Sequence, residues 1–165
     1  MATTTRPKTS VPARTRYEDD VYTWVGEQIE LLHAGRMNEV DARNVAEELS
    51  DVGNEIRSSL ESAIAVLTMH LLKWDHQSSK RLRSWRLTIV EQRRRIKRIL
   101  KRNPGLKSVL AEGIEEGYAD GRGRALMETR LAEGTLPEAC PFTFDEMMDR
   151  TIEFPEPPSQ GRKRR

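Results

Sequence analysis

The residue types best suited to chemistry in this sequence gather in two stretches. One stretch holds three carboxylates between residues 47 and 51, and the other runs from residue 70 to 93 and holds histidine, tryptophan, glutamine and arginine side chains. Carboxylates and histidine hold metal ions between helices in some bundles, and a pair of guanidiniums suits a phosphate. We group these residues as a candidate inter-helix polar cluster: Glu47, Glu48, Asp51, His70, Trp74, Trp85, Arg86, Gln92 and Arg93.

The spacing within this polar cluster matches no reaction signature. The sequence has no Glu-x-x-His pair, no His-x-x-x-His and no His-Glu-x-x-His, and no phosphate-binding glycine loop or Ser, His and acid order can be defended. We therefore predict no catalytic residue, no cofactor and no metal, and we lean towards a chain that is not an enzyme. The low-ranked metal candidates are His70, Glu48 and Asp51.

Packing offers a simpler interpretation of the same residues. We expect His70 to be a core histidine with satisfied hydrogen bonds, and Trp74 and Trp85 to anchor the core, because indole rings bury a large apolar area. Arg86 and Arg93 flank the inward face of their predicted helix, and arginines in such positions are ordinarily paired. Their expected partners are carboxylates of the preceding helix: Glu47, Glu48, Asp51 and Glu55.

Charge is distributed unevenly, although the formal net charge is only +2. Residues 17–62 carry twelve acidic and three basic residues, whereas residues 80–102 carry eleven basic residues and one acidic residue. We expect the two segments to lie antiparallel and to neutralise each other. The alternative is an exposed basic face that binds nucleic acid, helped by the basic end Arg162–Arg165. That face would consist of Lys80, Arg81, Arg83, Arg94, Arg95, Arg98, Lys101 and Arg102.

Apolar residues recur every three or four positions along the first half of the chain, which predicts two helices. The first covers about residues 17–33 and stops at Gly35. The second covers about residues 45–74, with an N-cap at Asp41 or Asn38. Gly53 interrupts its apolar stripe at a cost of roughly 1 kcal/mol relative to Ala.

The second half of the chain continues this periodicity with no competing strand pattern. A third helix spans about residues 80–102, a fourth follows Pro104, and Thr143 caps a short fifth helix. Glycines 113, 117 and 121 either let another backbone approach the fourth helix closely or make it bend and fray. These parts predict an all-α fold, an up-down bundle of about four main helices with a short C-terminal helix.

Length and composition predict one domain. The 165 residues are 36% hydrophobic, and we assign residues 17–154 to a single helical domain. Residues 1–16 and 155–165 lack periodicity and are rich in Pro and Arg, which predicts disordered tails. The sequence has no apolar run that could cross a membrane and no apolar block near its start. Because Cys140 is the single cysteine, we expect a cytoplasmic protein without a disulfide.

Six short blocks follow one another in the order found in a known family: Tyr17–Trp24, Glu47–Gly53, His70–Trp74, Ser84–Ile89, Gln92–Arg93 and Glu138–Phe142. In these blocks the chain resembles the bacterial family called domain of unknown function number 29, over about residues 17–154. The resemblance implies an all-helical bacterial protein, with cyanobacteria well represented in the family. It implies no particular activity.

Three functions follow as hypotheses of different classes. We favour a non-catalytic protein-interaction module, with a protein partner or self-association, because the motifs fit packing. The alternative is a nucleic-acid-binding protein that uses the basic helix within residues 80–102. A second alternative is a metal-dependent or hydrolytic enzyme with a site between the second and third helices. We expect no membrane partner.

Overall fold

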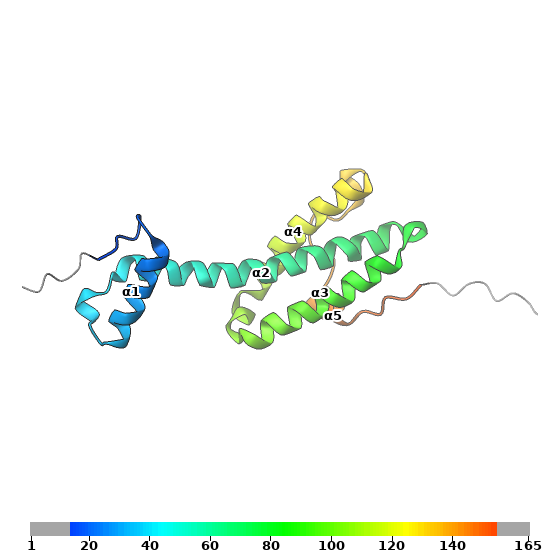
Figure 1. The fold of residues 1–165 in the computed structure, drawn as a ribbon. Coiled ribbons are helices and arrows are strands. Elements are labelled where there is room, and N and C mark those ends of the chain that lie inside the picture. Colours follow the sequence, from blue (N-terminus) through cyan, green and yellow to red (C-terminus); the bar gives the residue numbers. More distant parts are fainter. Residues whose placement is uncertain (1–13, 155–165) are drawn as a thin grey trace, which may run out of the picture. The chain divides into compact units, whose positions relative to one another are not determined.

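All regular structure in the described part of the chain is helical. The computed structural model describes residues 14–154, and this range holds five α-helices, four short 3₁₀-helices and no strand (Figure 1). The predicted all-α fold, with four main helices and a short C-terminal one, is confirmed. The predicted tails fall largely on residues 1–13 and 155–165, which lie outside the described residues.

Contacts between its residues divide the chain into two compact units. The first unit ends at Gly53 and the second begins at Asn54, so the boundary falls inside helix α2 (Ala42–His76). The apolar stripe of α2 continues across this boundary and is interrupted there by Gly53. The two units are described in turn.

The first unit is built around α1 (Val21–His33), which buries Trp24, Gln28 and Leu31. The helix begins four residues later than predicted, because Asp20 takes the N-cap and accepts a hydrogen bond from the Thr23 backbone N–H at 3.1 Å. It ends before Gly35, whose φ of +68° is the left-handed conformation that glycine adopts without strain. The predicted stop at Gly35 is therefore confirmed.

Short-range and medium-range hydrogen bonds complete the first unit. A 3₁₀-helix, η1 (Met37–Glu39), leads to Asp41, whose side chain accepts from the Asn44 backbone N–H at 3.3 Å and thereby caps α2 as predicted. The Thr15 backbone N–H and hydroxyl both donate to Glu27. Residues 14–16, which we assigned to the N-terminal tail, thus take part in the first unit.

In the second unit, α3 (Arg83–Arg102) returns antiparallel alongside the later part of α2 (Figure 1). The short 3₁₀-helix η2 (Ser78–Lys80) makes the connection. Large side chains fill the α2–α3 contact, with Ile89 and Ile96 of α3 fully buried against an apolar row of α2. That row consists of Leu60, Ile64, Leu67, Leu71 and Trp74.

Helix α4 (Leu110–Thr129) follows a 3₁₀-helix, η3 (Pro104–Val109), and packs on α2 through glycines. A Cβ added to Gly117 would lie 2.9 Å from the Glu61 carbonyl oxygen, and one added to Gly121 would lie 2.5 Å from the Ala65 carbonyl oxygen. Both distances are shorter than any ordinary contact, and α4 continues to Thr129. Gly117 and Gly121 therefore serve close backbone approach, and α4 does not fray at Gly121.

The chain then passes through a 3₁₀-helix, η4 (Glu133–Thr135), and an extended connection to α5 (Phe144–Asp149). Thr143 and Glu146 form a reciprocal capping box at its start, which confirms the predicted cap. Met147 and Met148 of α5 are buried in the same core as α2 and α3. The short helix α5 thus covers part of the core to which Ile96 belongs.

Candidate functional site

Helix α3 has two chemically distinct faces. The inward face carries Ile89 and Ile96, which are fully buried, and the outward face is mostly basic, with Leu87 and Glu91 exposed between Arg86 and Arg94. The helix carries nine basic residues and only Glu91 as an acidic one. We call its exposed basic side chains the α3 basic face: Arg83, Arg86, Arg94, Lys97, Arg98, Lys101 and Arg102.

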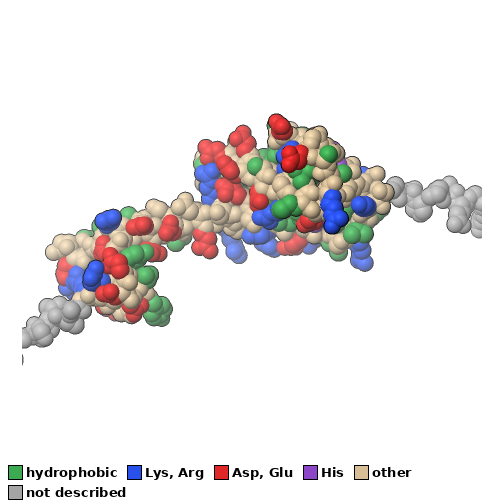
Figure 2. Space-filling model, turned by 90° about the horizontal axis from the view of Figure 1, so that it is seen from above, with side chains coloured by type: hydrophobic (Ala, Val, Ile, Leu, Met, Phe, Trp, Pro, Cys, Tyr) green, Lys and Arg blue, Asp and Glu red, His purple; other side chains and the backbone are tan. Residues whose placement is uncertain are grey.

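Little of this charge is neutralised by the protein. Among residues 14–154, two ion pairs involve basic side chains of α3, namely Lys97 with Asp149 at 3.4 Å and Arg98 with Glu91 at 3.3 Å. All four side chains are more than half exposed, so these pairs are weak. Figure 2 shows Lys and Arg side chains along one edge of the second unit, with Asp and Glu side chains more frequent along the opposite edge.

The predicted neutralisation by the acidic segment is not what the second unit shows. Of the acidic segment, only residues 54–62 belong to this unit, and its Glu61 pairs with Arg57 at 2.7 Å. Arg57 also pairs with Glu112 of α4 at 3.1 Å. Within the described second unit, the ion pairs of residues 54–62 therefore lie within α2 and between α2 and α4. They do not neutralise the basic side chains of α3.

The structure corrects the membership of the predicted nucleic-acid face. Arg81 donates to the Trp74 carbonyl at 2.9 Å and covers the Trp74 ring, with 5.0 Å from its guanidinium carbon to the ring centroid. Arg95 donates to the Ser59 hydroxyl at 3.2 Å and is half-buried. These two side chains link α3 and the connection before it to α2, so they are not part of the exposed face. Lys80 is exposed but lies in η2, before α3 begins.

Arg93 holds α5 in place. Its guanidinium donates to the Met147 carbonyl at 2.7 Å and to the Arg150 carbonyl at 2.8 Å. Burial, followed by the nearby charge of Arg150, lowers the pKa of Arg93. The carboxylate partner predicted for Arg93 is therefore wrong, since this side chain satisfies carbonyl groups at the end of α5 that have no helical partner. Arg86 is exposed and belongs to the α3 basic face.

His70 and Gln92 are the two members of the polar cluster with incomplete hydrogen bonding. Within the described residues, His70 Nδ1 and Gln92 Oε1 are buried without a hydrogen-bond partner. The predicted satisfied histidine is therefore wrong for this nitrogen. Burial, and next the positive charge of Lys73, lower the pKa of His70 to about 4, so the imidazole is neutral near pH 7.

The two tryptophans of the cluster lie where packing predicted. Trp74 is buried in the core, and Trp85 is half-buried and packs against the same core. Lys73, itself buried, lies with its Nζ 4.5 Å from the centroid of the Trp85 ring and forms an ion pair with Glu128 of α4. Lys73 therefore touches both α3 and α4, although neither its helical position nor its charge marked it as a core residue in the sequence.

The carboxylates of the polar cluster belong to the first unit, whereas its other members belong to the second. Glu48 accepts a hydrogen bond from the Tyr17 hydroxyl at 2.6 Å, and this bond raises the pKa of Tyr17 to about 12. Glu47 and Asp51 are exposed. Among residues 14–154 no three His, Cys, Asp or Glu side chains gather as ligands of one metal ion would, and this includes His70, Glu48 and Asp51.

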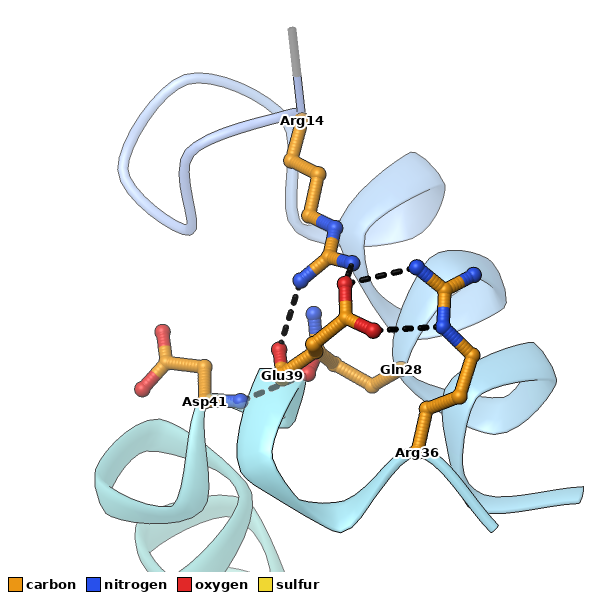
Figure 3. Close-up of polar contacts among 5 residues, drawn as sticks. All are labelled: Arg14, Gln28, Arg36, Glu39 and Asp41. Carbon is orange, nitrogen blue, oxygen red and sulfur yellow. Dashed lines mark hydrogen bonds and ion pairs between the residues drawn. The ribbon is translucent and has the colours of Figure 1, made fainter. Parts of the chain in front are cut away.

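The first unit has a polar cluster of its own that the sequence did not reveal (Figure 3). The Glu39 carboxylate accepts from Arg36 Nε at 2.6 Å and also pairs with Arg14, whose other terminal nitrogen donates to the Glu39 carbonyl at 2.8 Å. The buried Gln28 accepts from the Asp41 backbone N–H at 2.8 Å. The two arginines hold the pKa of Glu39 below its usual range, with Arg36 the larger cause.

This second cluster fastens three segments of the first unit to one another. A pocket of about 410 Å³ adjoins it and is lined in part by Arg14, Tyr17 and Asn44. Because both arginines are already engaged by Glu39, the cluster offers little free positive charge to a ligand. Among residues 14–154, the α3 basic face combines exposure, a single sign of charge and few internal partners.

A comparison with models of known protein families identifies the family of the chain. The family model described as Domain of unknown function DUF29 matches residues 16–152. The chain belongs to the DUF29 family. The match covers all five helices of this DUF29 chain and confirms the resemblance seen in the six sequence blocks. Neither among curated proteins nor among solved structures does any match the chain. None of the described helices of this DUF29 protein combines the length and the hydropathy needed to cross a bilayer.

Proposed function

We propose that this DUF29 protein is a non-catalytic binding module that binds nucleic acid along the α3 basic face. A single observation carries the proposal: α3 has nine basic residues and one acidic residue, and only two exposed, long ion pairs offset that charge within residues 14–154. Lys and Arg side chains that neutralise phosphates release condensed counterions, which is the main source of affinity for nucleic acids. We place this activity in the bacterial cytoplasm.

The length of the basic face favours an extended polyanion over a small anion. From Arg83 to Lys101 the face spans 18 residues, or roughly 27 Å at 1.5 Å per residue. A single phosphate would meet only one or two of its side chains, whereas a phosphate backbone repeats its charge along the whole stretch. On α4 the exposed Glu115 and Glu116 present the opposite sign and would keep a phosphate backbone away from that helix.

The test is fluorescence anisotropy with labelled DNA and RNA across a salt series. We expect the triple variant Arg83→Gln/Arg94→Gln/Lys101→Gln to bind roughly tenfold more weakly at low salt, with a log–log salt slope shallower by about 0.9 per lost duplex phosphate contact. Each of these three side chains is exposed and has no ion-pair partner among residues 14–154. Their loss should therefore leave the fold intact, as circular dichroism would show.

A matched control removes the same charge from elsewhere. The variant Arg43→Gln/Arg124→Gln/Arg130→Gln loses three positive charges outside α3 and should bind like the unmodified chain. Equal weakening by both triple variants would mean that net charge alone attracts the polyanion, and the α3 proposal would fail. A chain without residues 155–165 separates the contribution of the basic end Arg162–Arg165 from that of α3.

A protein-interaction module, the function favoured by the sequence, is the second candidate, and α1 supplies its observation. Val21, Val25, Ile29 and Leu32 recur at steps of three or four along one face of α1 and are 37% to 48% exposed. Sedimentation at increasing concentration tests self-association, which Ile29→Glu should abolish if α1 mediates it.

A further inference from the structure

The α3 basic face ends at a pocket with an apolar lining. The pocket has a volume of about 290 Å³ and lies between the end of α3, η3 and α5. Its apolar wall is formed by Leu100 of α3 and by Phe144 and Met148 of α5. Phe144 is half-buried, so part of its ring remains open to the pocket. A volume near 300 Å³ is at the lower end of the range for small-ligand sites.

Three lysines surround this wall. Lys97 and Lys101 belong to the α3 basic face, and Lys107 of η3 adds a charge from a different element. All three are exposed. The ion pair of Lys97 with Asp149 is long and exposed, so it exchanges readily for a phosphate. A polyanion that lies along α3 towards its C-terminus therefore stays in contact with basic side chains until it reaches this pocket.

Two aspartates of α5, Asp145 and Asp149, complete the pocket. Their carboxylates disfavour a phosphate inside the pocket itself and favour a group that donates N–H bonds. An unpaired nucleobase has a flat apolar face for Phe144 and exocyclic amino groups that carboxylates accept from. In a duplex these edges are paired and stacked, so they would not enter a pocket of this kind.

We propose that this pocket receives one unstacked base of a single-stranded nucleic acid whose phosphates lie on Lys97, Lys101 and Lys107. The inference rests on the proposed function of α3 and extends it by naming the preferred partner, a single strand rather than a duplex. Contact between bases and aromatic side chains is tolerant of sequence, because every base has a π-face. The aspartates add a preference for bases that carry an amino group.

The experiment compares three probes against the full chain: a labelled 12-nucleotide single strand of cytidines, an abasic strand of the same length, and a duplex of the same length. The cytidine strand should bind at least about fivefold more tightly than the abasic strand, in line with the contribution of one stacked base. Phe144→Leu should remove this difference without changing duplex binding. Phe142→Leu, the same change in a half-buried ring that does not line this pocket, should leave the difference in place.

Lys107→Gln provides a second variant that carries little risk to the fold, because Lys107 is exposed. It should make the salt slope for the single strand shallower by about 0.7 and leave the duplex slope unchanged. Equal binding of cytidine and abasic strands would overturn the pocket proposal while α3 remained a phosphate-binding helix. Binding of no probe would overturn both proposals.

Discussion

Helices α3 and α4 both pack on α2 in the second unit, and they do so by opposite means. Helix α3 uses large side chains, with Ile89 and Ile96 filling the space between the helices. Helix α4 uses Gly117 and Gly121, where the α2 backbone lies in the place of a side chain. A contact through side chains tolerates small changes in volume by repacking, whereas a contact through backbone does not.

The outer faces of the same two helices differ as well. The outer face of α3 is basic, and α4 carries exposed carboxylates such as Glu115 and Glu116. The comparison shows that packing and charge are divided differently in the two helices. Helix α4 makes the tighter contact with α2, while α3 concentrates a single sign of charge that packing does not require.

The largest expected effect concerns one methyl group on α4. Gly121→Ala should lower the free energy of unfolding by about 3 kcal/mol or more, because the new Cβ meets the Ala65 carbonyl of α2 and neither backbone can move freely. Gly123→Ala on the same helix has nothing within 4 Å of its Cβ and should raise stability by up to about 1 kcal/mol. Urea unfolding of both variants measures the contrast, and equal effects would show that helix propensity, not contact, governs α4.

One methyl group on α3 should matter less. Ile89→Val leaves a small cavity in the α2–α3 contact and should cost about 1 kcal/mol in the same urea experiment. A loss as large as that from Gly121→Ala would mean that the two contacts are equally rigid. The distinction between side-chain and backbone packing would then be wrong.

The third prediction concerns pH and His70. His70 lies one turn before Lys73 on α2, and Lys73 forms an ion pair with Glu128 of α4. Burial lowers the folded-state pKa to about 4 from an ordinary value of 6.5, so the unfolded chain takes up the proton first. The neutral form therefore contributes stability above pH 6.5 that is lost as pH falls from 6.5 to 4. Urea unfolding between pH 7 and pH 4 should show a smaller loss for His70→Gln than for the unmodified chain. Parallel pH profiles would contradict this assignment.

The smallest expected effect concerns the loss of stability that repulsion within the α3 basic face causes. Arg98 has Arg94, Arg95, Lys101 and Arg102 at positions three or four residues away, so like charges crowd it. Arg98→Gln should raise stability by about 0.5 kcal/mol at low salt, and the gain should vanish at high salt.

Glu116→Gln on α4 is the matched change, because Glu116 lies four residues from both Glu112 and Asp120. It should give a gain of similar size, and only Arg98→Gln should also weaken nucleic-acid binding. A loss of stability in the Arg98 variant would show that the basic residues support the fold.

Local features were accessible from the sequence. The caps at Asp41 and Thr143 depend on hydrogen bonds that span three residues, and the stop at Gly35 depends on one backbone angle. The third helix was predicted to begin three residues before its observed start and to end at its observed last residue. In each case the interaction partners are neighbours in the chain, so their spacing contains the necessary information.

Features that depend on a distant partner were not accessible. Arg93 and Arg95 lie two positions apart in the chain, yet one binds carbonyls more than fifty residues away and the other binds Ser59 of α2. Lys73 is buried because Trp85 and Glu128 arrive from two other helices. Helical periodicity gives the direction of a side chain around its own axis but not the group that another helix brings to it.

By itself, the sequence determined that this protein is all helical, that Thr143 caps its last helix, that α3 is basic and that α4 carries three glycines at four-residue spacing. The tertiary structure decided that the glycines serve close contact, that Arg81 and Arg95 are engaged while Arg83 and Arg94 are free of ion pairs in the described chain, and that Phe144 closes a pocket beside Lys97. The physical reason is range. Helix formation and charge follow from residues a few positions apart, whereas exposure, pairing and pockets arise only where segments distant in the chain meet.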